Sequence, residues 1–198
     1  MTYYNDDRKF TNYVHENIAK KQIYPKLNWI IQDINTIVAE NVDINNSVDY
    51  FAIDSNNNKI ITIQERFREK KYLNYNDFTI RYKRIFNKDP NRKLSEFFKL
   101  NVNYFVYGII DQSKIDVNEN GKFVKYAIIN IEKLLEMIDN GRIIIDESLQ
   151  SKYCKIEDNI LRCPVIENYD HSSSFVPFDI KILKNLFDKE IIIYSEGF

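Results

Sequence analysis

Two β segments joined by a short polar turn constrain the fold of this chain more than any other feature. VDYFAID runs from Val48 to Asp54, KIITIQERFR runs from Lys59 to Arg68, and SNNN separates them. Residues of this kind are typical of a tight turn, so the two segments predict an antiparallel hairpin. Side chains of a strand alternate between its faces. Gln64 and Arg66 therefore share one polar face of the second strand, and Glu65 lies on the other.

The remaining pattern predicts a mixed α/β (α+β) fold with one central mixed sheet flanked by helices. Helical spacing is seen over residues 10–18 and again over 27–37, and a turn is expected at 89–91. Residues 78–85 alternate between apolar and polar and predict a third strand, with a helix as the alternative. The other expected elements are strands over 102–110 and 123–129, helices over 94–100, 131–138 and 178–187, a short apolar segment at 143–145, a second hairpin over 153–163 and a loop at 171–174.

Composition places the chain among soluble globular proteins. Its 198 residues suit a single domain, 1–198, and an apolar content of 44% argues against disorder. The polar N-terminus does not have the pattern of a signal peptide, and no apolar run approaches the roughly 18 residues of a membrane span. The second hairpin would bring Cys154 opposite Cys163, and two cysteines do not make a disulfide framework. We therefore expect an intracellular, cytoplasmic protein with reduced thiols and no membrane partner.

Charge is distributed unevenly along the chain. Residues 59–99 hold twelve Lys and Arg against five Asp and Glu, whereas the chain as a whole carries a net charge of −1. Such an asymmetry often marks a surface for a polyanion, although a solvated surface with chance clustering gives the same pattern.

The polar face of the second strand has the residue types of a phosphodiesterase site. Counting back from the turn places Asp49 roughly opposite Gln64. A carboxylate and an amide oxygen suit Mg²⁺, which stabilises charge that develops on a phosphate. Arg66 would hold or orient that phosphate. The predicted catalytic residues are therefore Asp49, Gln64 and Arg66, and the predicted metal ligands are Asp49 and Gln64.

Asp49, followed by Gln64-x-Arg66 on the next strand, resembles the motif of the PD-(D/E)xK nuclease superfamily, whose usual pattern is an Asp and then Glu-x-Lys. The resemblance covers residues 5–130 by organisation and leaves 131–198 as C-terminal additions. It implies a restriction-endonuclease-like core and a DNA endonuclease of restriction or phage type that uses Mg²⁺, with Mn²⁺ as an alternative. Enzymes of this fold often act as dimers when they cut both strands, so a homodimer is a further expectation.

Two departures from the family pattern leave one formal negative charge at the predicted metal site. Gln64 replaces the usual Glu, and Arg66 replaces the usual Lys and cannot readily act as a base. This implies either weak metal binding or help from Glu65, or from Glu16 on the first helix, where family members often supply a Glu. The same departures favour an alternative, a catalytically inactive nuclease-fold protein that binds nucleic acid or a protein partner.

Basic residues around the motif are the predicted DNA contacts. Thr79 and Arg81 would share a face of the third strand, which makes Arg81 the best additional phosphate ligand. The full set is Arg68, Lys70, Lys71, Arg81, Lys83 and Arg84. A third interpretation is an unrelated α/β protein whose basic stretch is only surface. For the strand at 59–68 itself, the alternative is an edge strand whose outer charges discourage aggregation.

Overall fold

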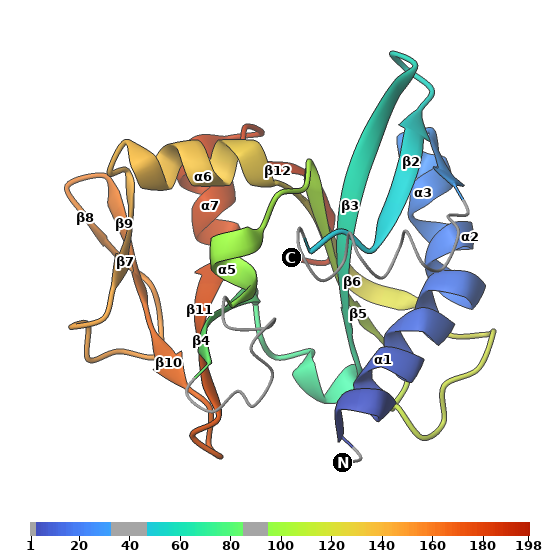
Figure 1. Ribbon diagram of the computed structural model, residues 1–198, viewed down its shortest axis with the longest axis horizontal. Helices are drawn as coiled ribbons and strands as arrows, with labels where there is room; N and C mark the ends of the chain where they lie inside the picture. Colours follow the sequence, from blue (N-terminus) through green and yellow to red (C-terminus); the bar gives the residue numbers. More distant parts are fainter. Residues whose placement is uncertain (1–2, 33–46, 85–94) are drawn as a thin grey trace.

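The computed structural model describes residues 3–32, 47–84 and 95–198, and these residues form a six-stranded mixed sheet with layers on both faces (Figure 1). The strand order is β1-β2-β3-β5-β6-β12, and β3 and β5 are the parallel pair. The strands are β1 (Trp29–Gln32), β2 (Tyr50–Asp54), β3 (Lys59–Arg68), β5 (Tyr104–Ile110), β6 (Phe123–Asn130) and β12 (Ile192–Glu196). The mixed α+β class predicted from the sequence is confirmed.

The N-terminal helices cover one face of this sheet. They are α1 (Tyr3–Val14), a π-helical turn (His15–Ala19), α2 (Lys20–Gln22) and α3 (Tyr24–Leu27). Phe10, Val14 and Ile18 recur at helical spacing and are buried against Ile63 and Val106 of the sheet. This apolar stripe is what fixes the helices to the sheet.

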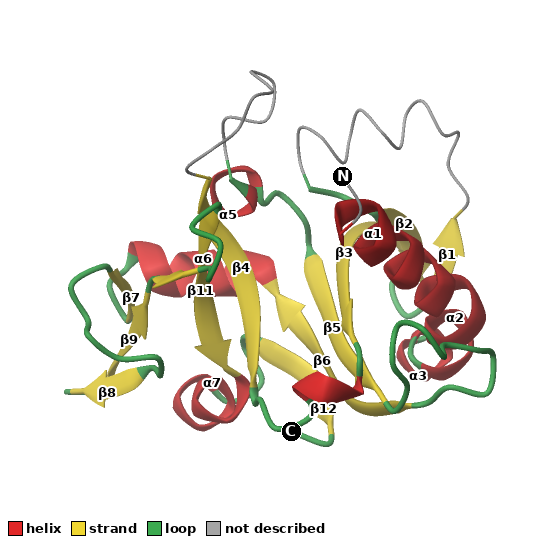
Figure 2. Cartoon of the chain, turned by 90° about the horizontal axis from the view of Figure 1, so that it is seen from below, coloured by secondary structure: helices red, strands yellow, loops and turns green. Residues whose placement is uncertain are grey.

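The second layer covers the opposite face and contains two small sheets. Their strand orders are β10-β11-β4 and β7-β9-β8. Figure 2 shows β4 and β11 on the side of β3 and β5 that faces away from α1. The elements are β4 (Asp77–Arg84), α5 (Glu96–Lys99), α6 (Ile131–Asp139), β7 (Ile143–Asp146), β8 (Lys155–Glu157), β9 (Ile160–Pro164), β10 (Ile166–Glu167), β11 (Ser173–Asp179) and α7 (Ile180–Phe187), with a short 3-10 turn at Lys70–Tyr72 before β4.

The predicted hairpin is confirmed, and its register sets the position of the polar face. Tyr50 pairs with Ile63 and Asp54 with Lys59. The segment at 78–85 is also a strand, but it pairs with β11 in a separate sheet and does not continue the central one. The second hairpin is confirmed as β8 and β9, joined at Asp158 and Asn159.

Two sequence predictions are wrong. Residues 29–32 form β1 and not part of a helix, because Asn28 adopts a left-handed conformation (φ 57°, ψ 37°) that ends α3, and the following aromatic and β-branched residues then pair with β2. The second half of the expected loop at 171–174 and the expected start of the helix at 178 are replaced by β11, while residues 171 and 172 do lie outside a strand; the partner of β11, β4, lies about 95 residues earlier. Local periodicity carries no information about such a distant partner.

The predicted turn at 89–91 and the part of the 27–37 helical pattern beyond Gln32 lie outside the described residues. Within the described ranges, no helix has both the length and the apolar character that a membrane crossing requires.

Gly108 in β5 lies under an aromatic ring, which predicts that an added methyl group will destabilise the fold. A Cβ at this position would lie 2.4 Å and 2.7 Å from two ring carbons of Phe123 and 3.3 Å from the ring of Phe67. We expect Gly108→Ala to lower the free energy of unfolding by about 1–3 kcal/mol, as overpacking does elsewhere. Urea denaturation measures this loss.

The control for this substitution is Ile115→Ala, since Ile115 is 95% exposed and its truncation should change stability by less than about 0.5 kcal/mol. Equal stability of Gly108→Ala and the wild type would mean that the Phe123 ring moves aside without cost.

Candidate functional site

β3 extends beyond the end of β2, so over residues 64–68 it has a neighbouring strand, β5, on one edge and no other strand of the described chain on the opposite edge. Asp49 lies where the two strands separate. Its backbone N–H donates to the carbonyl of Ile63 at 2.9 Å, and its carboxylate Oδ2 accepts from the backbone N–H of Glu65 at 2.7 Å. The Asp49 carboxylate therefore satisfies the backbone N–H group of Glu65, which has no strand on this edge of β3 to pair with in the described chain.

Glu65 points toward the N-terminal helices and is fully enclosed. Its carboxylate oxygens lie 2.8 Å and 2.9 Å from Nδ1 of His15, and one of them also accepts from the hydroxyl of Tyr24. The His15 ring stacks on Tyr50 with a centroid separation of 3.6 Å. Burial, together with the charge of Glu65, raises the pKa values of both Tyr24 and Tyr50, so both hydroxyls stay protonated. This cluster fixes the helix that carries His15 to β3.

Gln64 and Arg66 point to the other face, where both contact Glu96. The amide Nε2 of Gln64 donates to Oε1 of Glu96 at 2.7 Å, and the Arg66 guanidinium donates to both Glu96 oxygens. The backbone N–H of Arg81 donates to the same carboxylate at 3.1 Å, and Arg66 also donates to the carbonyl of Thr79. One buried carboxylate therefore joins β3, β4 and α5.

The positive charge of Arg66 keeps the Glu96 carboxyl ionised. Burial alone raises the pKa of this carboxyl, but the guanidinium of Arg66, its hydrogen bonds and the N–H of Arg81 outweigh burial and hold the pKa below its ordinary value. Glu96 is thus an anion at neutral pH, and its charge is matched by that of Arg66.

This donor set does not fit a Mg²⁺ ion held jointly by Asp49 and Gln64. Asp49 lines a surface cavity and Gln64 is not among the described residues that line it, because its side chain turns inward to Glu96. The carboxylate of Glu65 is taken up by His15 and Tyr24, with no side-chain exposure. The described part of the chain contains no group of three or more His, Cys, Asp and Glu residues suited to a metal ion.

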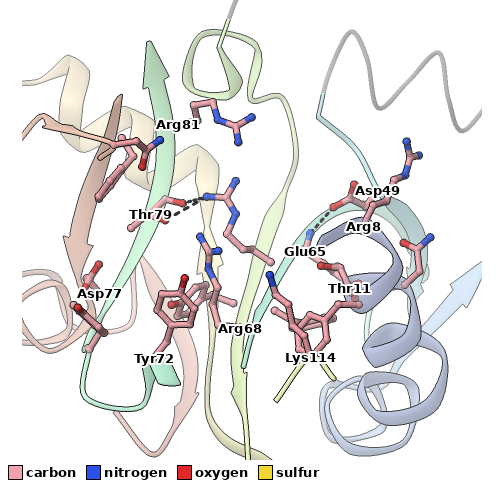
Figure 3. A pocket seen from close by; sticks show the side chains of 18 of the residues that line it. Arg8, Thr11, Asp49, Glu65, Arg68, Tyr72, Asp77, Thr79, Arg81 and Lys114 are labelled. Atoms are coloured by element: carbon pink, nitrogen blue, oxygen red, sulfur yellow. Dashed lines mark hydrogen bonds between the residues drawn. The ribbon is translucent and has the colours of Figure 1, made fainter. Parts of the chain in front are cut away.

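The cavity has a volume of about 830 Å³ and lies between α1 and β4, along the unpaired edge of β3. Figure 3 shows Arg8 and Thr11 of α1 on one wall and Thr79 and Arg81 of β4 on the opposite wall. Five basic side chains and two acidic ones line it: Arg8, Arg66, Arg68, Arg81 and Lys114, against Asp49 and Asp77, while Glu65 borders it through its backbone alone, since its side chain has no exposure.

Tyrosines add hydroxyl groups and ring surface to the cavity. Burial raises the pKa of Tyr107 to about 12, so its hydroxyl is protonated at neutral pH. The Arg68 guanidinium lies 5.2 Å from the ring centroid of Tyr72.

Burial, and next the charge of Asp179, raises the pKa of Asp77, which lies opposite Asp179 in the β4–β11 pair.

The structure brings some of the predicted DNA contacts into the cavity and leaves others outside it. Arg68 and Arg81 line it, as does Thr79, which agrees with the shared face predicted for Thr79 and Arg81. The remaining four, Lys70, Lys71, Lys83 and Arg84, are not among its lining residues; Lys71 pairs with Glu69 at 2.7 Å and Lys83 with Glu147 at 2.6 Å.

Sequence analysis missed two basic residues of the cavity, Arg8 and Lys114. Arg8, Thr11 and Asn12 recur at helical spacing, so the pattern of the first helix could have placed them on one face. Lys114 lies in a loop and has no comparable signal.

Glu16, which was predicted as a metal ligand on the first helix, is exposed and ion-paired with Lys20 at 2.8 Å.

Comparison of the chain with protein-family models, with curated proteins and with solved structures gave no match.

Because Glu96 neutralises Arg66 in the interior, Glu96→Gln should lower stability and change its dependence on pH. Arg66 keeps one fifth of its side chain exposed, so we expect a loss near the lower end of the range for breaking a buried pair, about 3 kcal/mol at pH 7. A lowered carboxyl pKa contributes stability that is present above the unfolded pKa and is lost as pH falls through the folded pKa. The wild type should therefore begin to lose this contribution as pH falls below the unfolded value of about 4.3, and Glu96→Gln should not show that part of the loss.

Urea denaturation at pH 7, 5 and 3.5 measures both effects. Glu136→Gln is the matched control, because Glu136 forms an exposed pair with Lys133 at 2.6 Å and its removal should change little. Parallel stability-versus-pH curves for Glu96→Gln and the wild type would contradict the assignment of Glu96 as the buried anion.

Proposed function

We propose that this protein binds the phosphate backbone of nucleic acid, with DNA as the expected form, in the cavity between α1 and β4. The observation that carries the proposal is the convergence of basic side chains from separate segments of the chain on one cavity. Arg8 comes from α1, Arg68 from β3, Arg81 from β4 and Lys114 from the loop after β5. Such a set attracts a polyanion through its charge, and its affinity falls with salt.

The order of the elements supports a nuclease-like scaffold. A helix is followed by an antiparallel meander, β1–β2–β3, and β5 then pairs in parallel with β3. Asp49, which the resemblance matches to the family's Asp, stands where β2 and β3 separate. The proposed protein is a catalytically silent form of this scaffold, since the Gln64 amide turns away from the cavity to Glu96, and Arg66, which lines the cavity, has its guanidinium bonded to the same carboxylate.

The tyrosines of the cavity suit a nucleic-acid strand better than a small inorganic anion. Tyr72 and Tyr75 line one end of the cavity with their ring centroids 6.1 Å apart, and Tyr75 is 54% exposed. Exposed rings offer bases a stacking surface, and the basic residues around them contact phosphates.

Removing one basic residue of the cavity should weaken binding to all DNA sequences alike. Arg81→Gln should lower the affinity and reduce the slope of log affinity against log salt by about 1. Fluorescence anisotropy with labelled single-stranded and duplex DNA across a salt series measures both quantities. Lys189→Gln is the matched control, because Lys189 is exposed and does not line the cavity.

An unchanged slope for Arg81→Gln, or an equal effect of Lys189→Gln, would show that DNA does not enter this cavity. Absence of binding by the wild type at low salt would refute the proposed function as a whole.

A metal-dependent DNA endonuclease is the second candidate, and the position of Asp49 in the cavity favours it. Its test is incubation of supercoiled plasmid with the protein and Mg²⁺ or Mn²⁺, beside Asp49→Asn and an EDTA control. The silent form predicts no nicking under conditions in which the same protein binds DNA. Nicking that is lost in both controls would establish the nuclease and displace the silent form.

A further inference from the structure

The β8–β9 hairpin places the two cysteines of the chain directly across from each other. Its turn residues Asp158 and Asn159 both have positive φ, 50° and 63°, as in the two-residue turn that matches the twist of a hairpin. The register pairs Glu157 with Ile160 and Lys155 with Arg162, so Cys154 lies opposite Cys163 one step further on. Their sulfur atoms are 3.6 Å apart and both are reduced.

The backbone at this position suits a disulfide. Antiparallel pairs alternate between hydrogen-bonded and non-hydrogen-bonded types, and the pair next to a two-residue turn is hydrogen-bonded. Counting from Glu157 and Ile160 makes Cys154 and Cys163 a non-hydrogen-bonded pair, for which the Cα atoms lie about 4.5 Å apart. That separation is within the range that disulfides span, about 4.4–6.8 Å.

The surroundings of the two thiols differ. Cys154 is partly exposed to solvent, whereas Cys163 is fully buried in the central strand of its sheet. The sulfur of Cys154 also lies 3.3 Å from the carbonyl of Pro177 in β11. One sulfur is therefore accessible, and the other is within reach of the first but shielded from solvent.

We propose that Cys154 and Cys163 form an oxidisable dithiol, in which Cys154 reacts with a small hydroperoxide and Cys163 then closes an intramolecular disulfide.

The chemistry has two balanced steps. The Cys154 thiolate attacks the outer oxygen of the hydroperoxide, an S–O bond forms and the O–O bond breaks, and the leaving alkoxide or hydroxide takes up a proton. The sulfur is oxidised by two electrons to a sulfenic acid, and the peroxide is reduced by two. Cys163 then gives up its proton and attacks the Cys154 sulfur, so that an S–S bond forms, the S–O bond breaks and water leaves.

Electrostatics support this division of roles. The neighbouring Cys163 thiol, and next the backbone N–H of Asp179, lower the pKa of Cys154 by hydrogen bonding to its thiolate. The same contact, with burial, raises the pKa of Cys163. The thiolate, which is the reactive form, is thereby concentrated on the accessible sulfur.

The first experiment treats the folded wild-type protein with hydrogen peroxide, blocks the remaining thiols and maps peptides without reduction. We expect a disulfide that links the peptides of Cys154 and Cys163 in one chain, with both thiols recovered by dithiothreitol. Thiols that remain unreacted, or disulfides that join separate chains only, would overturn the proposal.

Two serine variants separate the roles of the sulfurs. In Cys163→Ser, oxidation by hydrogen peroxide should stop at a sulfenic acid on Cys154, which dimedone traps. In Cys154→Ser, the remaining Cys163 should react with hydrogen peroxide at least about tenfold more slowly than Cys154 does in the first variant. Equal rates in the two variants would refute the assigned order. The peptide map of the wild type decides the existence of the dithiol even if one variant fails to fold.

Discussion

One buried carboxylate, that of Glu96, connects the two layers on which the site is built. It accepts hydrogen bonds from Arg66 and Gln64 of β3 and from the backbone of Arg81 in β4, and it belongs to α5. Removing an anion and a guanidinium from water costs several kcal/mol, and this cost is offset only when every partner is in place. The position of β4 relative to β3, and hence the width of the cavity between β4 and α1, depends on this set of bonds.

The face of β3 that carries Gln64 and Arg66 is therefore polar because these residues bond to the second layer, and not because the face is open to solvent. An edge strand with outward charges would leave Gln64 and Arg66 exposed, but Gln64 is 8% exposed and Arg66 is paired. The opposite face of the same strand makes a second polar contact, through Glu65 with His15 and Tyr24. Glu65 thus joins β3 to the π-helical turn and α3 on one face, Glu96 joins it to β4 on the other, and the unpaired edge of the strand is left to line the cavity.

Local patterns in the sequence predicted the elements whose partners are close along the chain. The hairpin at 48–68 and the second hairpin have adjacent strands and turn residues with strong preferences, and both are confirmed. β1 was missed because its apolar residues also fit helical spacing, and only pairing with β2 decides between the two. β11 was missed because β4 is so distant in sequence. The partner of Arg66 was missed for the same reason: Glu96 lies 30 residues later, in a segment with no motif.

Position in the fold, more than position in the sequence, also decides which basic residues line the cavity. Residues 59–99 are strongly basic, yet Lys71 and Lys83 form pairs with acids at the surface and Arg66 forms one inside. Among the described residues of this run, Lys71, Lys83 and Arg66 are thus paired with acids, and Arg66, Arg68 and Arg81 line the cavity. Arg8 and Lys114 supply charge there from outside the run. An anion approaching this protein would respond to the charge that converges in space, so the cavity, and not the basic run, is the feature on which recognition of a polyanion depends.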